Sequence, residues 1–439
     1  MILNRPLTPK EMEASQHFYN LYSVVNGMSY MCLGDTVVIL FALRLKCPDI
    51  VVSALGAMVY AGFLFLPLGK WMTARTGAVR SQADFWVLRN LSSLVIAAAA
   101  PLAAWGCPGA AVFLILSGSL MFYGFRAAGV VMLQPLIGEV CPPGTRGRVI
   151  ARSWMYFYAA GFLTLLVITF LLRLLPGTNT ICGIIIAGAV LGIASSFFMR
   201  FMCETGEIRT AARRPIFREY GRVLALPAVR QQICAGIVCY IGLILTVPIS
   251  LLTVKKGFLA ADTQALIFSM VQLFSSIPAS YLQSRISDRF GGKVMIVCGY
   301  LLICLLALYW IVVPAGFSWG FLLAPFLIAA CGSVCIHNAL AQYFLETVSK
   351  RVQVSASIFI SIASGVVAGL LGMGAGALLL RIAAALNTSA LPLTTYRIYF
   401  FAVLLLLAGL STLIFRLADP RKAPSRRNAP LKKSEKGVY

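Results

Sequence analysis

Twelve long apolar segments recur along this chain of 439 residues, and they constrain its fold more than any other feature. We place them at 18–41, 50–68, 83–105, 109–133, 149–172, 181–203, 231–253, 264–283, 294–313, 319–341, 353–376 and 396–416. A helix needs ~20 such residues to cross the hydrocarbon layer of a membrane. Hydrophobic residues make up 60% of the chain and charged residues only 12%, whereas soluble domains average ~45–50% and ~25%. The sequence therefore predicts an all-α membrane protein with twelve transmembrane helices.

The chain is also basic, with a formal net charge of +23 from 37 Lys and Arg residues and 14 Asp and Glu residues. Twelve spans put both termini on one side, where 29 of the 37 basic residues fall; seven fall on the other side and Arg126 lies inside a span. This count treats Arg89 as a loop residue. Because basic residues concentrate in cytoplasmic loops, we expect a multi-pass protein of the cell membrane with cytoplasmic termini. The charge orients the chain in the lipid bilayer, and no nucleic acid partner is needed to explain it.

The longest internal hydrophilic segment divides the spans six and six. We predict an N-terminal lobe at 1–203, a cytoplasmic interlobe loop at 204–230, a C-terminal lobe at 231–417 and a disordered basic tail at 418–439. The chain carries no phosphate-binding loop, no metal-ligand pattern and no nucleophile–base set. We therefore expect neither an enzyme nor a cofactor or metal site, and we expect a monomer.

Two short sequence similarities relate the two halves of the chain, and we call them echoes. The segment 284–293 follows the eighth span as 70–77 follows the second, at an offset of 214 residues. Glu139 and Glu346, 207 residues apart, each end an even-numbered span just before a short basic loop. Such echoes indicate a duplicated six-helix unit, the parallel repeat of two-lobed transporters.

The echoing segments also carry a family resemblance. Ser284-Arg-Ile-Ser-Asp-Arg-Phe-Gly-Gly-Lys293 resembles the Gly-x-x-x-Asp-Arg-x-Gly-Arg-Lys loop of the major facilitator superfamily, and 135–148 is similar to that family's loop between spans 4 and 5. The resemblance covers the whole chain. It implies two six-helix lobes in the major facilitator fold and secondary active transport of a small-molecule substrate by alternating access.

The loop at 284–293 predicts a gate on the cytoplasmic side. Asp288 ends a span among basic residues, and the resemblance suggests the start of span 5, around Arg148 and Arg152, as its partner, where the helix dipole also favours an anion. Ala74 takes the equivalent place in the first half, so we expect an asymmetric latch; the alternative is a plain topology anchor. The gating candidates are Glu139, Arg146, Arg148, Arg152, Asp288, Arg289, Gly291 and Glu346.

Ionisable residues within the apolar layer are the candidates for transport chemistry, because each is costly there unless it faces a partner or a wet cavity. Asp35 on span 1 and Arg126 on span 4 are such residues. The resemblance places both spans along the cavity and implies an acid–Arg pair that a proton breaks. Arg126 lies seven residues closer to the cytoplasm than the family's usual Arg. The alternatives are local hydrogen bonding of Asp35 beside Gly34, and an Arg126 that holds carbonyls or receives an anionic substrate.

The remaining cavity candidates are polar rather than acidic. They are Asn26, Tyr30, Tyr123, Gln272, His337 and Asn338. We expect a secondary transporter of a small neutral or anionic solute, coupled to protons in symport through Asp35. The alternatives are an exporter of amphiphilic compounds or drugs, and a non-transporting receptor or scaffold on the same fold.

Overall fold

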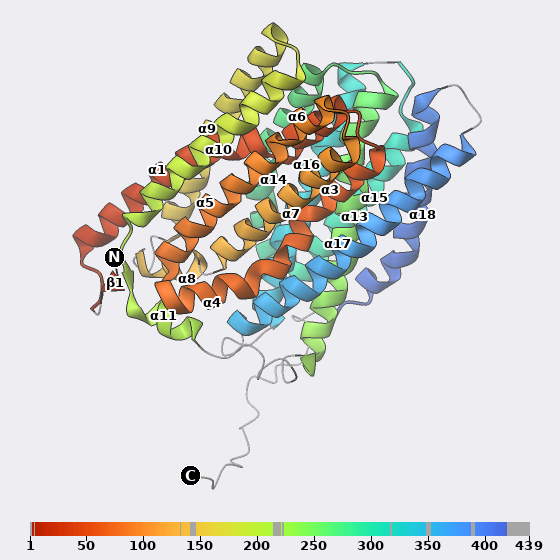
Figure 1. Cartoon of the computed structure of the whole chain (residues 1–439). Coiled ribbons are helices and arrows are strands. Elements are labelled where there is room, and N and C mark those ends of the chain that lie inside the picture. Colours follow the sequence, from red (N-terminus) through yellow and green to blue (C-terminus); the bar gives the residue numbers. More distant parts are fainter. Residues whose placement is uncertain are drawn as a thin grey trace.

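The computed structural model describes residues 2–3, 5–131, 133–140, 146–213, 221, 224–316, 318–347, 353–387 and 391–418. Within them, twelve helical spans are long and apolar enough to cross a membrane. Each coincides with one predicted segment, so the twelve-span architecture is confirmed. The spans run side by side through one elongated bundle (Figure 1). The tail beyond residue 418 and residues 214–220 of the predicted interlobe loop lie outside the described residues.

Spans 1–6 form the N-terminal lobe. They are α1 (Pro9–Leu33) with α2 (Asp35–Arg44), α3 (Asp49–Ala61) with the 3-10 turn η1 (Gly62–Phe65) and α4 (Leu66–Thr76), α5 (Ala78–Ala97) with α6 (Ala99–Ala104), α7 (Pro108–Val130), α9 (Arg146–Leu174) and α10 (Thr178–Arg200). The short helices α8 (Leu133–Val140) and α11 (Gly206–Ala212) follow spans 4 and 6. Strands β1 (Ile2–Leu3) and β2 (Glu204–Thr205) pair in parallel and tie the N-terminus to the end of the lobe.

Spans 7–12 form the C-terminal lobe. They are α13 (Pro227–Leu252) with the π-helical turn η2 (Thr253–Gly257), α14 (Asp262–Phe290), α15 (Gly292–Val312), α16 (Trp319–Thr347), α17 (Gln353–Leu386) and α18 (Pro392–Phe415). The backbone repeats between the lobes at the turns after spans 2 and 8. Gly77 has φ +89° and Gly291 has φ +85°, both with ψ 167°, and each precedes the first residue of the next span. Only glycine adopts such angles without strain, which explains this part of the sequence echo.

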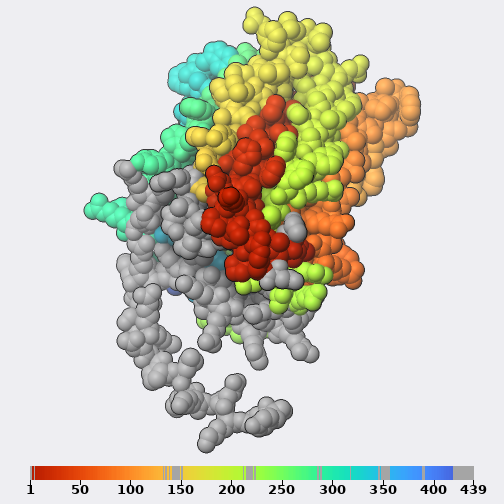
Figure 2. Space-filling model, turned by 90° about the vertical axis from the view of Figure 1, so that its left-hand side faces the viewer, coloured from red at the N-terminus to blue at the C-terminus, as the bar shows by residue number. Residues whose placement is uncertain are grey.

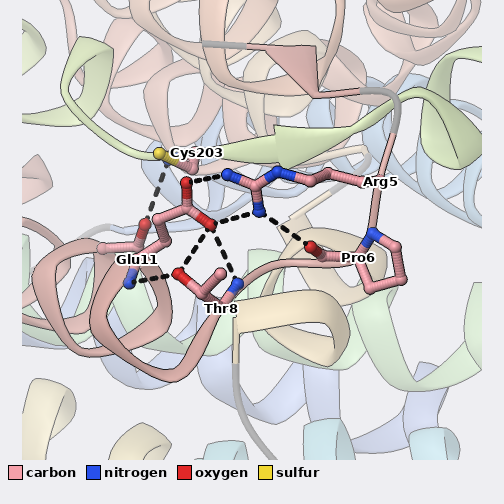
Figure 3. Close-up of polar contacts among 6 residues, drawn as sticks. Arg5, Pro6, Thr8, Glu11 and Cys203 are labelled. Carbon is pink, nitrogen blue, oxygen red and sulfur yellow. Dashed lines mark hydrogen bonds and ion pairs between the residues drawn. The ribbon is translucent and has the colours of Figure 1, made fainter.

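Local chemistry fixes where the first helix begins. Thr8 caps α1 in a capping box with Glu11: the Glu11 backbone N–H donates to Thr8 Oγ1, and Glu11 Oε2 accepts from the Thr8 backbone N–H at 2.8 Å (Figure 3). Arg5 donates to both Glu11 oxygens at 2.9 and 2.7 Å. This reciprocal arrangement satisfies free donors at a helix start. The capped end lies at the surface, beside the yellow-green residues that follow α10 (Figure 2).

The main contacts between the two lobes join α3 with α17, α3 with α13, and α9 with α14. Glycines of α17 allow the closest approach. A Cβ added at Gly369 would lie 3.1 Å from the Ala61 backbone nitrogen and 3.3 Å from the Ala57 carbonyl oxygen. Small residues permit such backbone contact in membranes, where no hydrophobic force drives helices together. Gly365 and Gly376 of α17 likewise face Phe63 and Ser53 of the N-terminal lobe, so these glycines lie at the seam between the lobes.

Candidate functional site

The bundle has two ends. We call the end at Pro9 and Phe415 the termini face, and the opposite end, where α2 ends at Arg44 and α3 begins at Asp49, the far face. Span 1 breaks between them, because Gly34 is extended (φ −69°, ψ 165°) and separates α1 from α2. The break places Asp35 in the first turn of α2, partway through the bundle.

A cavity of about 250 Å³ lies at this break, between the lobes. Span 1 contributes Tyr30, Asp35 and Thr36 to its wall, and the C-terminal lobe contributes residues of α13, α14 and α16, among them Ser269 and Gln272. The hydroxyls of Thr36 and Ser269 are 2.8 Å apart, a hydrogen bond from one lobe to the other. The cavity therefore belongs to both lobes.

Asp35 faces this cavity, and its side chain is solvent-accessible although it lies within the bundle. Its carboxylate accepts a hydrogen bond from the Tyr123 hydroxyl of α7. Arg126, one turn further along α7, donates instead to the Tyr30 hydroxyl at 3.3 Å, and its guanidinium carbon lies 5.0 Å from the centre of that ring. Asp35 and Arg126 thus share one cluster through two tyrosines, without an ion pair between them in the described structure.

Arg89 joins the same cluster, which corrects its assignment to a loop. It lies on α5 and is 1% exposed. Its Nη1 donates to Asn26 Oδ1 at 3.2 Å, and that oxygen also accepts from Trp86 Nε1 at 3.0 Å. Its guanidinium carbon lies 4.9 Å from the Trp86 ring centre and 6.0 Å from that of Tyr30. The assignment was wrong because proximity to a span end suggested a loop, whereas aromatic rings and an amide cover this side chain.

The C-terminal lobe candidates are spread out. Gln272 lines the central cavity. His337 lines a separate cavity of about 220 Å³ between α13, α16 and α17, and its Nδ1 is 2.8 Å from the Ser333 carbonyl oxygen. Asn338 donates to Gln283 on α14 at 2.8 Å and so links two helices of its own lobe. The structure therefore joins Asn26, Tyr30, Asp35, Tyr123 and Arg126, and leaves Asn338 outside that group.

Ion pairs join the two lobes at the far face. Arg44 of span 1 donates to Asp262 Oδ2 of span 8 from Nε at 2.7 Å and from Nη2 at 2.6 Å. Lys256 of span 7 pairs with Asp49 of span 2, whose Oδ2 also accepts from the Tyr396 hydroxyl at 3.2 Å. Each lobe supplies a cation at the end of its first span and an acid at the start of its second. Sequence reasoning missed this set, although Asp49 and Asp262 are 213 residues apart, close to the repeat offset of 214.

A second polar network covers the termini face of the N-terminal lobe. Glu139 of α8 accepts from the Thr205 backbone N–H at 2.9 Å and from its hydroxyl at 2.6 Å. Glu204 is 2% exposed and accepts from the backbone N–H groups of Ala78 and Val79 at 2.6 and 3.2 Å, which caps α5 from a distant part of the chain. Burial raises the pKa of Glu204, and the two N–H groups oppose that rise.

The predicted latch of Asp288 lies largely outside the described residues. The side chains of Asp288, Arg146, Arg148 and Glu346 are not described. Arg152 is exposed at the start of α9, and the Arg289 guanidinium carbon lies 5.4 Å from the Phe290 ring centre. The latch and its partner stay a prediction.

Comparison with solved structures finds the same architecture in known transporters. A mutant of the nucleoside transporter NupG matches with a TM-score of 0.71 at 12% identity, over 91% of this chain and 99% of that chain. The xylose transporter XylE from E. coli matches with 0.63 at 14%, over 96% and 100%. A POT family transporter in complex with 5-aminolevulinic acid matches with 0.62 at 12%, over 91% and 96%. Comparisons with protein-family models and with curated proteins give no match.

Twelve apolar spans in two lobes, with a cavity between them, define a polytopic membrane protein built like a transporter. Its fold is that of the major facilitator superfamily, as the loop resemblance implies.

Proposed function

We propose that this protein is a secondary active transporter that moves a small neutral or anionic solute by alternating access. The observation that carries the proposal is the central cavity, which both lobes line and which a charged cluster borders. Its neighbours in fold are described as nucleoside, xylose and POT family transporters. Reorientation of two lobes around such a site is the general mode of action of folds built from repeats.

Orientation follows from charge. The basic loops lie at the termini face, so we assign this face to the cytoplasm of a cell membrane. The interlobe ion pairs then hold the external side closed, and the solute exchanges with the cytoplasm in this conformation. We retain the division into lobes at 203 and 231, a single copy as the working unit, and the Asp288 latch as parts of the proposal.

Proton coupling is proposed through Asp35. Among the acidic residues that the structure describes, it alone lies near the middle of a span rather than at a span end or in a loop. The charged and titratable groups facing it are Tyr60 of α3 and Tyr123 and Arg126 of α7. Protonation would weaken the acceptor of the Tyr123 hydrogen bond and change the charge of the cavity wall, which links the proton to solute binding.

The alternatives make different demands on the cavity. Export of amphiphilic compounds needs a wide cavity, whereas a volume of about 250 Å³ favours a small solute. A receptor or scaffold needs no exchange between two faces.

The test is uptake by proteoliposomes, with and without an inward proton gradient, for candidate solutes chosen by thermal-shift screening. We expect gradient-driven uptake by the wild type and gradient-independent exchange by Asp35→Asn. Equal responses of the two proteins to the gradient would remove Asp35 from coupling. Absence of any solute movement by a correctly folded wild type would favour the receptor alternative.

A further inference from the structure

We infer that the site selects a small organic monocarboxylate, which Arg126 binds directly and which the charge of the nearby Arg89 helps to stabilise. The inference rests on the proposed transport function and names its substrate class. It starts from the charge of the cluster: two guanidiniums and a single carboxylate lie within the bundle around Tyr30.

The two arginines lack an anionic partner in the described structure. Neither forms an ion pair, and Asp35 accepts instead from Tyr123. Arg89 is 1% exposed, and its Nε and Nη2 have no hydrogen-bond partner among the described residues. A guanidinium keeps its charge in proteins, and an uncompensated buried charge is costly. The cluster therefore carries excess positive charge and gains stability from a bound anion.

Arg126 is the group positioned to meet that anion. It is half-buried, and its acceptor is the hydroxyl of Tyr30, a residue of the cavity wall. The bond is 3.3 Å long, beyond the usual 2.7–3.2 Å range of N–H···O bonds. A carboxylate entering beside Tyr30 replaces this weak neutral acceptor with two charged oxygens that match the fork of a guanidinium. Arg89, which is buried with its guanidinium carbon 6.0 Å from the centre of the Tyr30 ring, adds its positive field without touching the ligand.

The rest of the cavity sets the remaining features of the ligand. Its wall is mostly apolar, with Ile39, Leu165, Leu251, Leu273 and Phe326, and its volume is about 250 Å³. This wall fits an apolar body rather than the full hydration shell of phosphate or sulfate. With Asp35 ionised the cluster has one positive charge more than negative charge, so a single carboxylate balances it. A small monocarboxylate with an apolar body meets all three conditions.

The experiment measures the thermal stability of the purified full-length protein in nanodiscs at constant ionic strength. The probes are acetate, benzoate and succinate, each paired with its neutral amide, together with inorganic phosphate. We expect benzoate to raise Tm saturably, and benzamide, succinate and phosphate to raise it less. Arg126→Gln should weaken benzoate binding at least about tenfold, the loss expected for a charge-assisted bond. Arg173→Gln, an exposed arginine at the far end of α9, should bind benzoate like the wild type.

Tyr30→Phe provides a second variant should Arg126→Gln fail to fold. It keeps the ring that lies near both guanidiniums and deletes the competing hydroxyl, so benzoate should bind at least as tightly as to the wild type. The inference is overturned if no carboxylate stabilises the protein more than its amide does, if phosphate equals benzoate, or if Arg126→Gln keeps the wild-type Kd.

The two proposals fail separately. Benzoate binding that depends on Arg126, without movement of benzoate or any screened solute into proteoliposomes, would refute transport and support the anion site. Uptake of a neutral solute that is unchanged in Arg126→Gln would support transport and refute the anion site.

Discussion

The ion pairs at the far face lead to the sharpest prediction, because one of them can be cut with a single isosteric change. Asp262→Asn removes the charge that Arg44 binds across the lobes. Lys255 also pairs with Asp262, at 2.5 Å, but both belong to the C-terminal lobe. That pair persists when the lobes separate, so of the two contacts of Asp262 only the one with Arg44 contributes to closure of the far face.

The magnitude follows from exposure. The Asp262 side chain is 6% exposed, whereas that of Arg44 is 41% exposed and well screened by solvent. We therefore assign ~1 kcal/mol to the interlobe pair, the upper end for exposed pairs. Losing ~1 kcal/mol shifts the balance between closed and open far faces about fivefold toward open. The second pair, Lys256 with Asp49, remains and limits the shift.

Distance measurements by electron spin resonance test this prediction. Labels at Trp105 and Leu391, both exposed near the far face in opposite lobes, report its opening in a background without native cysteines. Asp262→Asn should increase the long-distance population about fivefold. The matched control is Asp84→Asn, which cuts the 2.8 Å pair with Arg200 inside the N-terminal lobe. The reasoning is refuted if Asp262→Asn leaves the distances unchanged, or if both variants shift them equally.

Three further predictions concern the seam, the second pair and the termini face. Gly369→Leu should destabilise the protein by ~1–3 kcal/mol through overpacking and so lower its Tm, whereas Gly374→Leu, with open space at its Cβ, should not; equal losses would contradict the close contact. Asp49→Lys should open the far face in the same spin-label assay, and adding Lys256→Asp should close it again; failure of the double swap would argue against a direct pair. Burial raises the pKa of Glu204, so the stability linked to its proton is present at low pH and lost as pH rises. The Tm of the wild type relative to Glu204→Gln should fall as the pH rises above about 4.3, the ordinary pKa of a glutamate, and a rise would contradict this sign.

The spans could be predicted because hydropathy is a property of each segment alone. Their ends could not. Helix α14 continues to Phe290 although its apolar segment was placed at 264–283, and α1 begins at Pro9 rather than 18. Helices extend into polar sequence beyond the apolar layer, because backbone hydrogen bonding and caps such as Thr8 decide where they stop. Hydropathy does not register either factor.

The site was only half predictable for a different reason. Asp35 and Arg126 stand out because a charge amid apolar residues is visible in the sequence. Arg89 does not, since its burial depends on Trp86 and on Asn26 of another helix. In the sequence, Asp49 and Asp262 of the far face look like ordinary loop acids, because they gain their partners from the opposite lobe only through contact between the lobes. Contacts between distant segments decide both the burial of Arg89 and the pairing of the far-face acids. For these acids, the repeat offset was the only signal in the sequence.

The repeat separates what the two lobes share from what only one has. The far-face pairs come in duplicate, one cation and one acid from each lobe. The charged cluster has no such counterpart: at the offset of 213 that relates Asp49 to Asp262, Asp35 corresponds to Pro248 and Arg126 to Ala339. Variants of the far-face ion pairs should therefore change the rate of exchange for every solute alike. Variants of the cluster should change which solute is chosen. A substitution in a far-face ion pair that alters the preference for a carboxylate over its amide would contradict this division. The residues of these pairs lie at the far face and do not line the central cavity.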